Sequence, residues 1–461
     1  MNFNFKENIT QKYSALIYLV KRNYIESLTL DLKKKRKLDE KEVAEKIIRS
    51  LVPYHNPLST FLSKYNIFFN SKGAFNDDIF NGLSHSNNFK IYQYSRQLNK
   101  SLATNFLPKS MSHWNYLSND KKIIKAKLKL REFYQKLFIQ ISKKIKIDAW
   151  LSGNFGQFDE QEMAKAINIC NGKFISFHKE CMLSDGWRDY FFKAFTSGRE
   201  PFEGHGLIVY NNLTKKLIVD SGLYDEKKIK ILGMLRLDEL HSWRRKNIGV
   251  KLNSKKLGVF FTQPTAQFPS MIYKMGLKAF YDKKKDLEWT NLVKKTNQII
   301  YEIACENHDI KITIKPKISD LEYAINLFKS FGKLPKNLTI SSNFYNNASE
   351  LIKDNDIICA FNSSSILESI VSGKTVISPR FEEANEKRYQ SHLLNFNNIP
   401  TYANSPNELK EILLEKIRSE KEIVKDLNND QREVIEYWTN NPSGDLKKRM
   451  PIILENLITS N

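Results

Sequence analysis

The pattern of apolar and polar positions predicts alternating strands and helices from residue 146 onward. Short apolar runs are typical of parallel strands that are buried on both faces. In the first half these runs lie at 147–151, 173–177, 207–210 and 229–232. The pattern restarts in the second half at 257–261, 311–314, 338–340, 357–361 and 376–377. Because most runs are followed by a turn and an amphipathic stretch, we expect two doubly wound α/β domains that face each other across a cleft.

A polar and basic stretch at 239–256 separates the two halves, so we place the domain boundary near residue 250. The first predicted domain covers residues 1–250 and includes a helical N-terminal extension. The second covers residues 251–440. We expect the remaining residues, 441–461, to form a helix that packs back on the first domain.

The first 145 residues carry weaker signals. Amphipathic periodicity predicts helices at 13–32, 40–51 and 120–145, and one alternating run predicts a strand at 89–94. Further along the chain, the spacing of Ser, Asp and Glu residues predicts capping boxes that begin helices. The expected pairs are Asp159 with Glu162, Ser319 with Glu322, Ser365 with Glu368, and Ser405 with Glu408.

The most informative stretch is 356–380, which reads as strand, polar turn, helix, glycine stop and strand. Ser363, Ser364 and Ser365 form the turn, at a helix N-terminus just beyond the end of a strand. Free amides and the helix dipole favour anions at such a position. One hydroxyl is enough to cap a helix, so three favour a phosphate site over a purely structural cap.

Charge and cysteine content narrow the range of binding partners and cellular compartments. The formal net charge is +22, for which nucleic acid, an anionic membrane surface and compositional drift compete as explanations. We rank the membrane surface with an anionic substrate first and nucleic acid last, because the sequence has no zinc finger or RNA-recognition signature. Four scattered cysteines without metal-ligand spacing favour a reducing, cytoplasmic setting. No apolar run approaches the ~20 residues of a membrane helix, so association with the inner membrane would be peripheral.

Several motifs, taken in order, resemble GT-B glycosyltransferases. They are Gly233-x-x-Arg236-Leu237-Asp238, Lys315-Pro316 at a strand end, and Ser363 to Glu368 followed by Gly373 to Pro379. Within this superfamily the chain is similar to bacterial surface- and capsule-polysaccharide transferases, which are related to Kdo transferases and CDP-glycerol glycerophosphotransferases. The resemblance covers about residues 146–440.

This resemblance implies an inverting glycosyltransferase that needs no metal and no cofactor. The donor would be a nucleotide-activated hexose or ulosonic acid, and the acceptor a lipopolysaccharide or capsule glycan, free or lipid-linked. The chain departs from the related patterns at Leu235, where proline is common, and at Lys317, where histidine is common. The His-Gly pair typical of glycerophosphotransferases is not present in its usual form, which favours sugar transfer over glycerol-phosphate transfer.

Such an enzyme needs groups that hold the donor phosphates and stabilise the leaving group. We expect the serine turn to hold the phosphates, with Lys315 and Arg236 adding positive charge. Glu368 is a candidate for binding a ribose or sugar hydroxyl, and the alternative is that it only completes a capping box.

The general base is expected on the first domain, on the opposite wall of the cleft. The leading candidates for the base are Glu180 and His178. The second-choice candidates are Asp185, Glu203 and His205. Each of these residues also has an ordinary structural interpretation. Three further functions stay open. One is a UDP-sugar 2-epimerase of the same fold, which would need a denser set of carboxylates and histidines. The others are a glycerol-phosphate transferase and, as a distant alternative, a basic nucleic-acid-binding protein.

Overall fold

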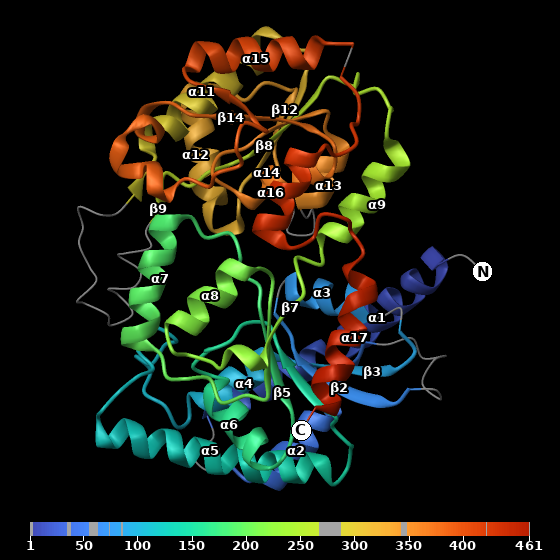
Figure 1. The fold of residues 1–461 in the computed structure, drawn as a ribbon, viewed down its shortest axis with the longest axis vertical. Helices are drawn as coiled ribbons and strands as arrows, with labels where there is room; N and C mark the ends of the chain where they lie inside the picture. Colours follow the sequence, from blue (N-terminus) through green and yellow to red (C-terminus); the bar gives the residue numbers. More distant parts are fainter. Residues whose placement is uncertain are drawn as a thin grey trace.

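A computed structural model describes residues 3–34, 38–54, 63–72, 74–83, 86–266, 287–342, 348–420 and 422–460. These residues fold into two α/β lobes stacked along the long axis of the molecule (Figure 1). Each lobe is built on its own mostly parallel sheet, with apolar clusters packed on both faces. The expected fold class, two doubly wound domains, is confirmed.

The sheet of the first lobe has the strand order β1-β3-β2-β4-β5-β6-β7. All neighbouring strands are parallel except β1 and β3. The near-continuous apolar runs of the central strands leave them completely buried. The strands are β1 (Val52–Pro53), β2 (Tyr65–Asn70), β3 (Phe89–Tyr94), β4 (Ala149–Ser152), β5 (Phe174–His178), β6 (Gly206–Val209) and β7 (Ile229–Ile231).

The sheet of the second lobe has the order β12-β11-β8-β13-β14-β15 and is parallel throughout. Its strands are β8 (Lys256–Phe260), β11 (Lys311–Lys315), β12 (Leu338–Ile340), β13 (Ile357–Cys359), β14 (Thr375–Pro379) and β15 (Thr401–Ala403). A separate antiparallel ribbon joins β9 (Thr265–Ala266) and β10 (Leu287–Glu288).

Helices fill the connections between strands. In the first lobe they are α1 (Phe3–Lys34), α2 (Glu40–Ser50), α3 (Ala74–Leu83), α4 (Arg96–Ala103), α5 (Lys121–Ser142), α6 (Gln161–Ile169), α7 (Asp185–Gly198), α8 (Asn212–Asp220) and the short η2 (Glu226–Lys228). The second lobe has α11 (Thr290–Glu306), η5 (Ile318–Asp320), α12 (Leu321–Phe331), α13 (Ala348–Asp354), α14 (Ser364–Val371), η6 (Glu382–Asn385), η7 (Lys387–His392) and α15 (Pro406–Arg418).

Three further helices connect the lobes: α9 (Leu237–Asn247), α16 (Asn429–Thr439) and α17 (Leu446–Thr459). Figure 1 shows α17 returning from the second lobe to the first, where Met450 and Leu454 join the apolar cluster of the first sheet. A shared cluster holds the lobes together, and it combines Met234 and Leu237 with Leu367 of α14 and Trp438 of α16. The N-terminus of α14 is therefore positioned by contacts from both lobes.

The strand expected at 89–94 is confirmed, but β2 was not expected from the sequence. The structure places β2 between β3 and β4, in the centre of the first sheet. The capping boxes expected at Asp159 and Ser319 are wrong, because neither side chain bonds to the first turn of its helix. Asp159 binds Arg96 instead, and Ser319 donates to its neighbour Asp320. At Ser405 the expected cap is present, with the hydroxyl accepting from the amide of Glu408.

Candidate active site

The second sheet has a topological switch point between β8 and β13. After β8 the chain builds β11 and β12 on one side, and it then crosses over to build β13, β14 and β15 on the other. Open α/β sheets bind ligands at such a point, outside the carboxyl ends of the strands. A cavity of about 270 Å³ lies there, which we call the donor cavity. Its lining includes Thr262, Lys315, Ser363, Ser364, Ser365 and Glu368.

The serine turn forms the start of α14. Ser363 is the N-cap, with extended backbone angles of φ −136° and ψ 151°, and its Oγ accepts from the amide of Ser365 at 3.3 Å. The capping box expected at Ser365 and Glu368 is therefore wrong, because the helix begins two residues earlier. Ser364 instead donates its hydroxyl to Glu368 Oε1 at 3.2 Å. The Ser363 hydroxyl and carbonyl accept from the amides of Ser365 and Ile366, which leaves the remaining first-turn amide and the hydroxyls at the start of α14.

The preceding residue fixes the approach to the turn. Asn362 has a φ of +44°, a conformation that few residues other than glycine, asparagine and aspartate adopt readily. Its side-chain amide donates to the carbonyl of His392 at 3.1 Å and accepts from the amide of Leu394 at 2.7 Å. The turn is thus tied to the segment that follows η7.

Glu368 connects the donor cavity to the first lobe. Its side chain is 9% exposed, and Oε1 lies 3.7 Å from Nε of Arg236, which is 30% exposed. Burial raises the pKa of Glu368, although the Arg236 cation and the Ser364 hydroxyl oppose the rise. Burial lowers the pKa of Arg236, but the carboxylates of Glu368 and Asp78 outweigh that effect and raise it overall. The ion pair with Arg236 and the hydrogen bond from Ser364 both involve Oε1 of Glu368.

A second cavity of about 440 Å³ adjoins the donor cavity and shares Glu368 and Ala348 with it. We call it the junction cavity because both lobes line it. Its polar lining includes Asp77, Lys179, Glu180, Arg236, Glu239 and Glu368. The exposed Glu180 enters from the segment after β5, and its carbonyl is held by the hydroxyl of Thr214 at 3.0 Å. The structure therefore brings Glu180, Arg236, Glu368, Lys315 and the serine turn to one pair of connected cavities.

His178 and Asp185 lie outside these two cavities. His178 ends β5, is 4% exposed, and has its ring 4.9 Å from that of Phe155. Burial and nearby cations hold the pKa of His178 well below its usual value. Asp185 starts α7 on the surface, where it pairs with Arg188, and it lines a different cavity.

Glu203 and His205 lie at the wrong end of the first sheet. Both precede β6, which places them at the amino ends of the parallel strands, whereas the cleft faces the carboxyl ends. Glu203 pairs with Lys165 at 2.9 Å. Nε2 of His205 lies 2.9 Å from the carbonyl of Leu457 on α17. Neither residue faces the junction cavity.

Asp78, a buried acid whose charge interacts with Arg236, was not predicted from the sequence. Asp78 on α3 is 1% exposed and accepts from the hydroxyl of Tyr210, while its Oδ1 has no partner within the described part of the chain. Burial raises its pKa, and the Arg236 cation opposes that rise. The Asp77-Asp78 pair was a visible signal, but it lies in the region where no helix was predicted.

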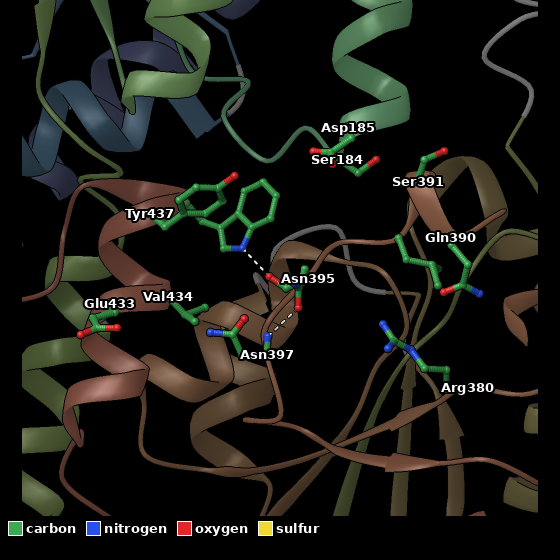
Figure 2. A pocket seen from close by; sticks show the side chains of 12 residues that line it. Ser184, Asp185, Arg380, Gln390, Ser391, Asn395, Asn397, Glu433, Val434 and Tyr437 are labelled. Carbon is green, nitrogen blue, oxygen red and sulfur yellow. Dashed lines mark hydrogen bonds between the residues drawn. The ribbon is translucent and has the colours of Figure 1, made fainter. Parts of the chain in front are cut away.

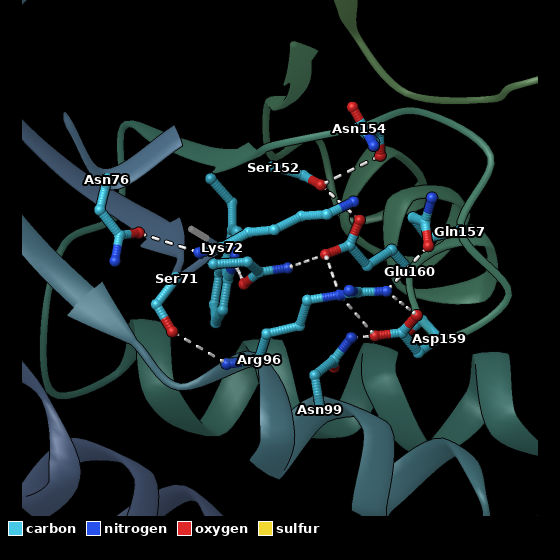
Figure 3. A network of polar contacts seen from close by, with 12 residues as sticks. Ser71, Lys72, Asn76, Arg96, Asn99, Ser152, Asn154, Gln157, Asp159 and Glu160 are labelled. Carbon is cyan, nitrogen blue, oxygen red and sulfur yellow. Dashed lines mark hydrogen bonds and ion pairs between the residues drawn. The ribbon is translucent and has the colours of Figure 1, made fainter. Parts of the chain in front are cut away.

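The switch point of the first sheet, between β2 and β4, carries a buried polar network (Figure 3). Arg96 donates to both oxygens of Asp159 at 2.8 and 3.1 Å, and it lies 3.7 Å from Glu160. Glu160 in turn accepts from Asn70 at 2.8 Å. Burial, together with Arg96, lowers the pKa of the neighbouring Lys72 to about 8. This network gives the wall of the first lobe a fixed shape.

The described ranges offer neither a metal-binding cluster nor a membrane-spanning helix. No group of three or more His, Cys, Asp or Glu side chains there is arranged to hold a metal ion. Separately, none of the helices among these residues combines the length and apolarity that a membrane span requires.

No protein-family model matches the sequence, and no curated protein matches it. Solved structures with a similar fold include UDP-GlcNAc 2-epimerase from Neisseria meningitidis bound to UDP-GlcNAc, at 13% identity and a TM-score of 0.43, covering 86% of this chain and 100% of that one. The UDP-GlcNAc 2-epimerase of Methanocaldococcus jannaschii matches at 13% identity and a TM-score of 0.45, covering 85% and 99%. A variant of the wall teichoic acid polymerase TagF matches at 12% identity and a TM-score of 0.45, covering 96% and 98%. Identities and TM-scores this low assign no activity to this chain.

Proposed function

We propose that the chain is an inverting, metal-independent glycosyltransferase that moves a sugar from a nucleotide-activated donor to a surface-glycan acceptor. One observation carries the proposal. The serine turn, at the switch point of the second sheet, opens into a cavity that is connected to the acid-lined junction cavity between the lobes. An anion site and a carboxylate on the opposite lobe are the two parts that such a transfer requires.

The donor cavity is suited to a phosphorylated ligand. The amides and hydroxyls of the serine turn would hold the phosphates, helped by the dipole of α14. Lys315 and Arg236 would add positive charge from two sides. Oε2 of Glu368 would accept from a hydroxyl of the ribose or the sugar.

The chemical step would then take place in the junction cavity. Glu180 removes the proton from the acceptor hydroxyl, and the resulting oxygen attacks the anomeric carbon from the face opposite the nucleotide. The bond between the anomeric carbon and the phosphate oxygen breaks, and its electron pair leaves with the nucleotide. Lys315, Arg236 and the amides of α14 stabilise that negative charge.

The lining of the junction cavity also supports a second candidate, a nucleotide-sugar epimerase. Four carboxylates line this cavity, those of Asp77, Glu180, Glu239 and Glu368. A pair of acids on opposite faces of a sugar ring can remove a proton and return it on the other side, without an acceptor. No histidine lines the described part of the cavity.

The two candidates are separated by their need for an acceptor. The protein would be incubated with UDP-, GDP-, CMP- and CDP-activated sugars, with and without a glycolipid extract from encapsulated bacteria. Nucleotide release that requires the extract supports the transferase. An epimerised nucleotide sugar formed without the extract supports the epimerase. If no donor gives either product, both candidate functions are refuted.

We infer that the acceptor is reached at an anionic membrane surface through α1. This helix buries one face against the first lobe, including Ile25, Leu28 and Leu32. On the opposite face Leu16, Leu19 and Val20 are 60%, 63% and 73% exposed. An apolar stripe on a basic protein of net charge +22 is suited to the interface of an anionic bilayer.

A further inference from the structure

A third cavity, of about 630 Å³, lies between the lobes and shares no lining residue with the donor or junction cavity. The first lobe contributes Ser184 and Asp185, at the start of α7 (Figure 2). The second lobe contributes Arg380, Gln390 and Ser391 of η7, Asn395 and Asn397 in the segment after η7, and Glu433 and Tyr437 of α16. The proposed reaction uses only the donor and junction cavities, so this cavity is free to hold a different ligand.

The hydroxyl of Ser184 is buried in the wall of this cavity without a partner. Ser184 is 2% exposed and occupies the N-cap position of α7, yet its side chain makes no capping hydrogen bond. Its Oγ has no hydrogen-bond partner among the described residues. Leaving a buried hydroxyl unpaired costs about 1–3 kcal/mol, so the start of α7 carries an unused polar group at the edge of this cavity.

Arg380 faces the same cavity from the carboxyl edge of the second sheet. Its guanidinium stacks on the ring of Tyr402, 4.3 Å from the centroid, and forms no ion pair with any residue that the structure describes. Stacking holds the side chain in one orientation while leaving its edge donors available. The side-chain amides of Asn395 and Asn397 also line the cavity. The Asn395 side chain is fixed because its Oδ1 accepts from the backbone amide of Asn397 at 2.8 Å.

An exposed aromatic ring completes the lining. Tyr437 on α16 is 50% exposed, and its ring lies 5.0 Å from that of Trp438, which donates from Nε1 to the carbonyl of Asn395 at 2.9 Å. A sugar ring has an apolar face of C–H groups and a rim of hydroxyls. Aromatic rings match that face, while fixed amides, carboxylates and a guanidinium match the rim.

We infer that this cavity is an oligosaccharide-binding site, separate from the reacting centre, that holds sugar units of the acceptor glycan. Ser184 lies four residues after Glu180, so their Cα atoms are at most about 14 Å apart even if the segment is fully extended. A glycan in the third cavity therefore lies within a few sugar units of the proposed base. The identification of the glycan as the acceptor rests on the proposed function, whereas its binding does not.

The test measures binding without turnover. Saturation-transfer NMR would follow chitotetraose, maltotetraose and a hyaluronan tetrasaccharide against the full chain and its variants. We expect at least one of these probes to bind, and Tyr437→Ala and Arg380→Met each to weaken its binding at least tenfold, which is about 1.4 kcal/mol. The matched control is Phe192→Ala, an exposed ring on α7 that does not line the cavity. Circular dichroism would confirm that each variant is folded.

Binding that survives both substitutions, or no binding of any probe, overturns the inference. Failure of the proposed function would look different. In that case nucleotide donors would not bind, while a probe would still bind in a manner that depends on Tyr437. Glu180→Gln should leave the affinity for the probes unchanged, because Glu180 does not line the third cavity.

Discussion

Replacing Arg236 by methionine tests the ion pair between the lobes. The substitution keeps an apolar side chain but removes the cation beside Glu368 and Asp78. Two unit charges 3.7 Å apart interact by about 4.5 kcal/mol at an effective dielectric constant of about 20. Because Arg236 is 30% exposed, solvent screening reduces this energy, and we expect a loss of roughly 2 kcal/mol at pH 8.

The loss should depend on pH in a defined direction. Burial raises the folded-state pKa of Glu368 above its unfolded value. A carboxyl with a raised pKa supports the fold while it is protonated, and this support is lost as the pH rises through the folded pKa. Without Arg236 the pKa of Glu368 rises further, and that of Asp78 moves in the same direction. At pH 5 both groups are closer to neutral, so the variant should lose less stability there than at pH 8.

Thermal unfolding of wild type and variant at pH 5 and pH 8 measures this effect. For a lobe of about 200 residues, a loss of about 2 kcal/mol lowers the midpoint by roughly 4–8 °C. Arg236→Met combined with Glu368→Gln should recover most of the loss at pH 8. The control is Arg388→Met, which removes an exposed pair with Glu386 and should leave the midpoint unchanged. If Arg236→Met lowers the unfolding midpoint equally at both pH values, or more at pH 5 than at pH 8, the reasoning is refuted.

Two further predictions concern the base and the membrane. Glu180→Gln should lower kcat by about 10²–10⁴-fold, because the proposed base is lost. The melting temperature should stay unchanged, because Glu180 is exposed. Glu239→Gln, in the same cavity, should lower kcat far less. Steady-state kinetics decide this, and a fully active Glu180→Gln enzyme excludes Glu180 as the base. Leu19→Gln with Val20→Gln should reduce co-sedimentation with phosphatidylglycerol vesicles at least tenfold, because each apolar side chain contributes about 1.5–3 kcal/mol when buried. Ile169→Gln, an exposed position on α6, is the matched control, and undiminished sedimentation of the α1 variant would exclude this surface.

The parts of the fold that sequence predicted best are those set by local pattern. The strand at 89–94 alternates clearly, and the apolar runs after residue 146 fall on strands of the structure. By contrast, β2 (Tyr65–Asn70) was missed, because its run lacks alternation and its place in the sheet depends on pairing with the distant β4. Local pattern cannot show which distant strand completes a sheet.

The capping box expected at Asp159 and Glu162 failed because long-range partners compete for both side chains. The carboxylate of Asp159 accepts from Arg96. Glu162 accepts from the hydroxyl of Tyr116 at 2.8 Å and forms an ion pair with Arg131 at 2.7 Å. These partners are far away in sequence and bind more strongly than an exposed cap would. Spacing alone therefore predicted the helix but assigned the wrong role to its first residues.

In the candidate site too, features set by local sequence were predicted, whereas features set by long-range packing were not. The position of the serine turn between a strand and a helix was predicted correctly, because these elements follow one another directly in sequence. That His178 is buried beside Phe155 follows from packing between separate segments, which no spacing reveals. Glu203 and His205 were considered because they are chemically suitable, but their position before β6 places them at the opposite end of the sheet.

Donor binding at the serine turn tests the central claim most directly. A thermal-shift panel of CMP-, UDP-, GDP- and CDP-activated sugars should contain one donor that stabilises the protein by about 2.7 kcal/mol when present at 100 times its Kd. Ser364→Ala with Ser365→Ala should weaken that donor at least tenfold, whereas Ser405→Ala, at the cap of α15, should not. A donor that binds the serine variant as well as wild type, or a panel in which no donor binds, would contradict the account.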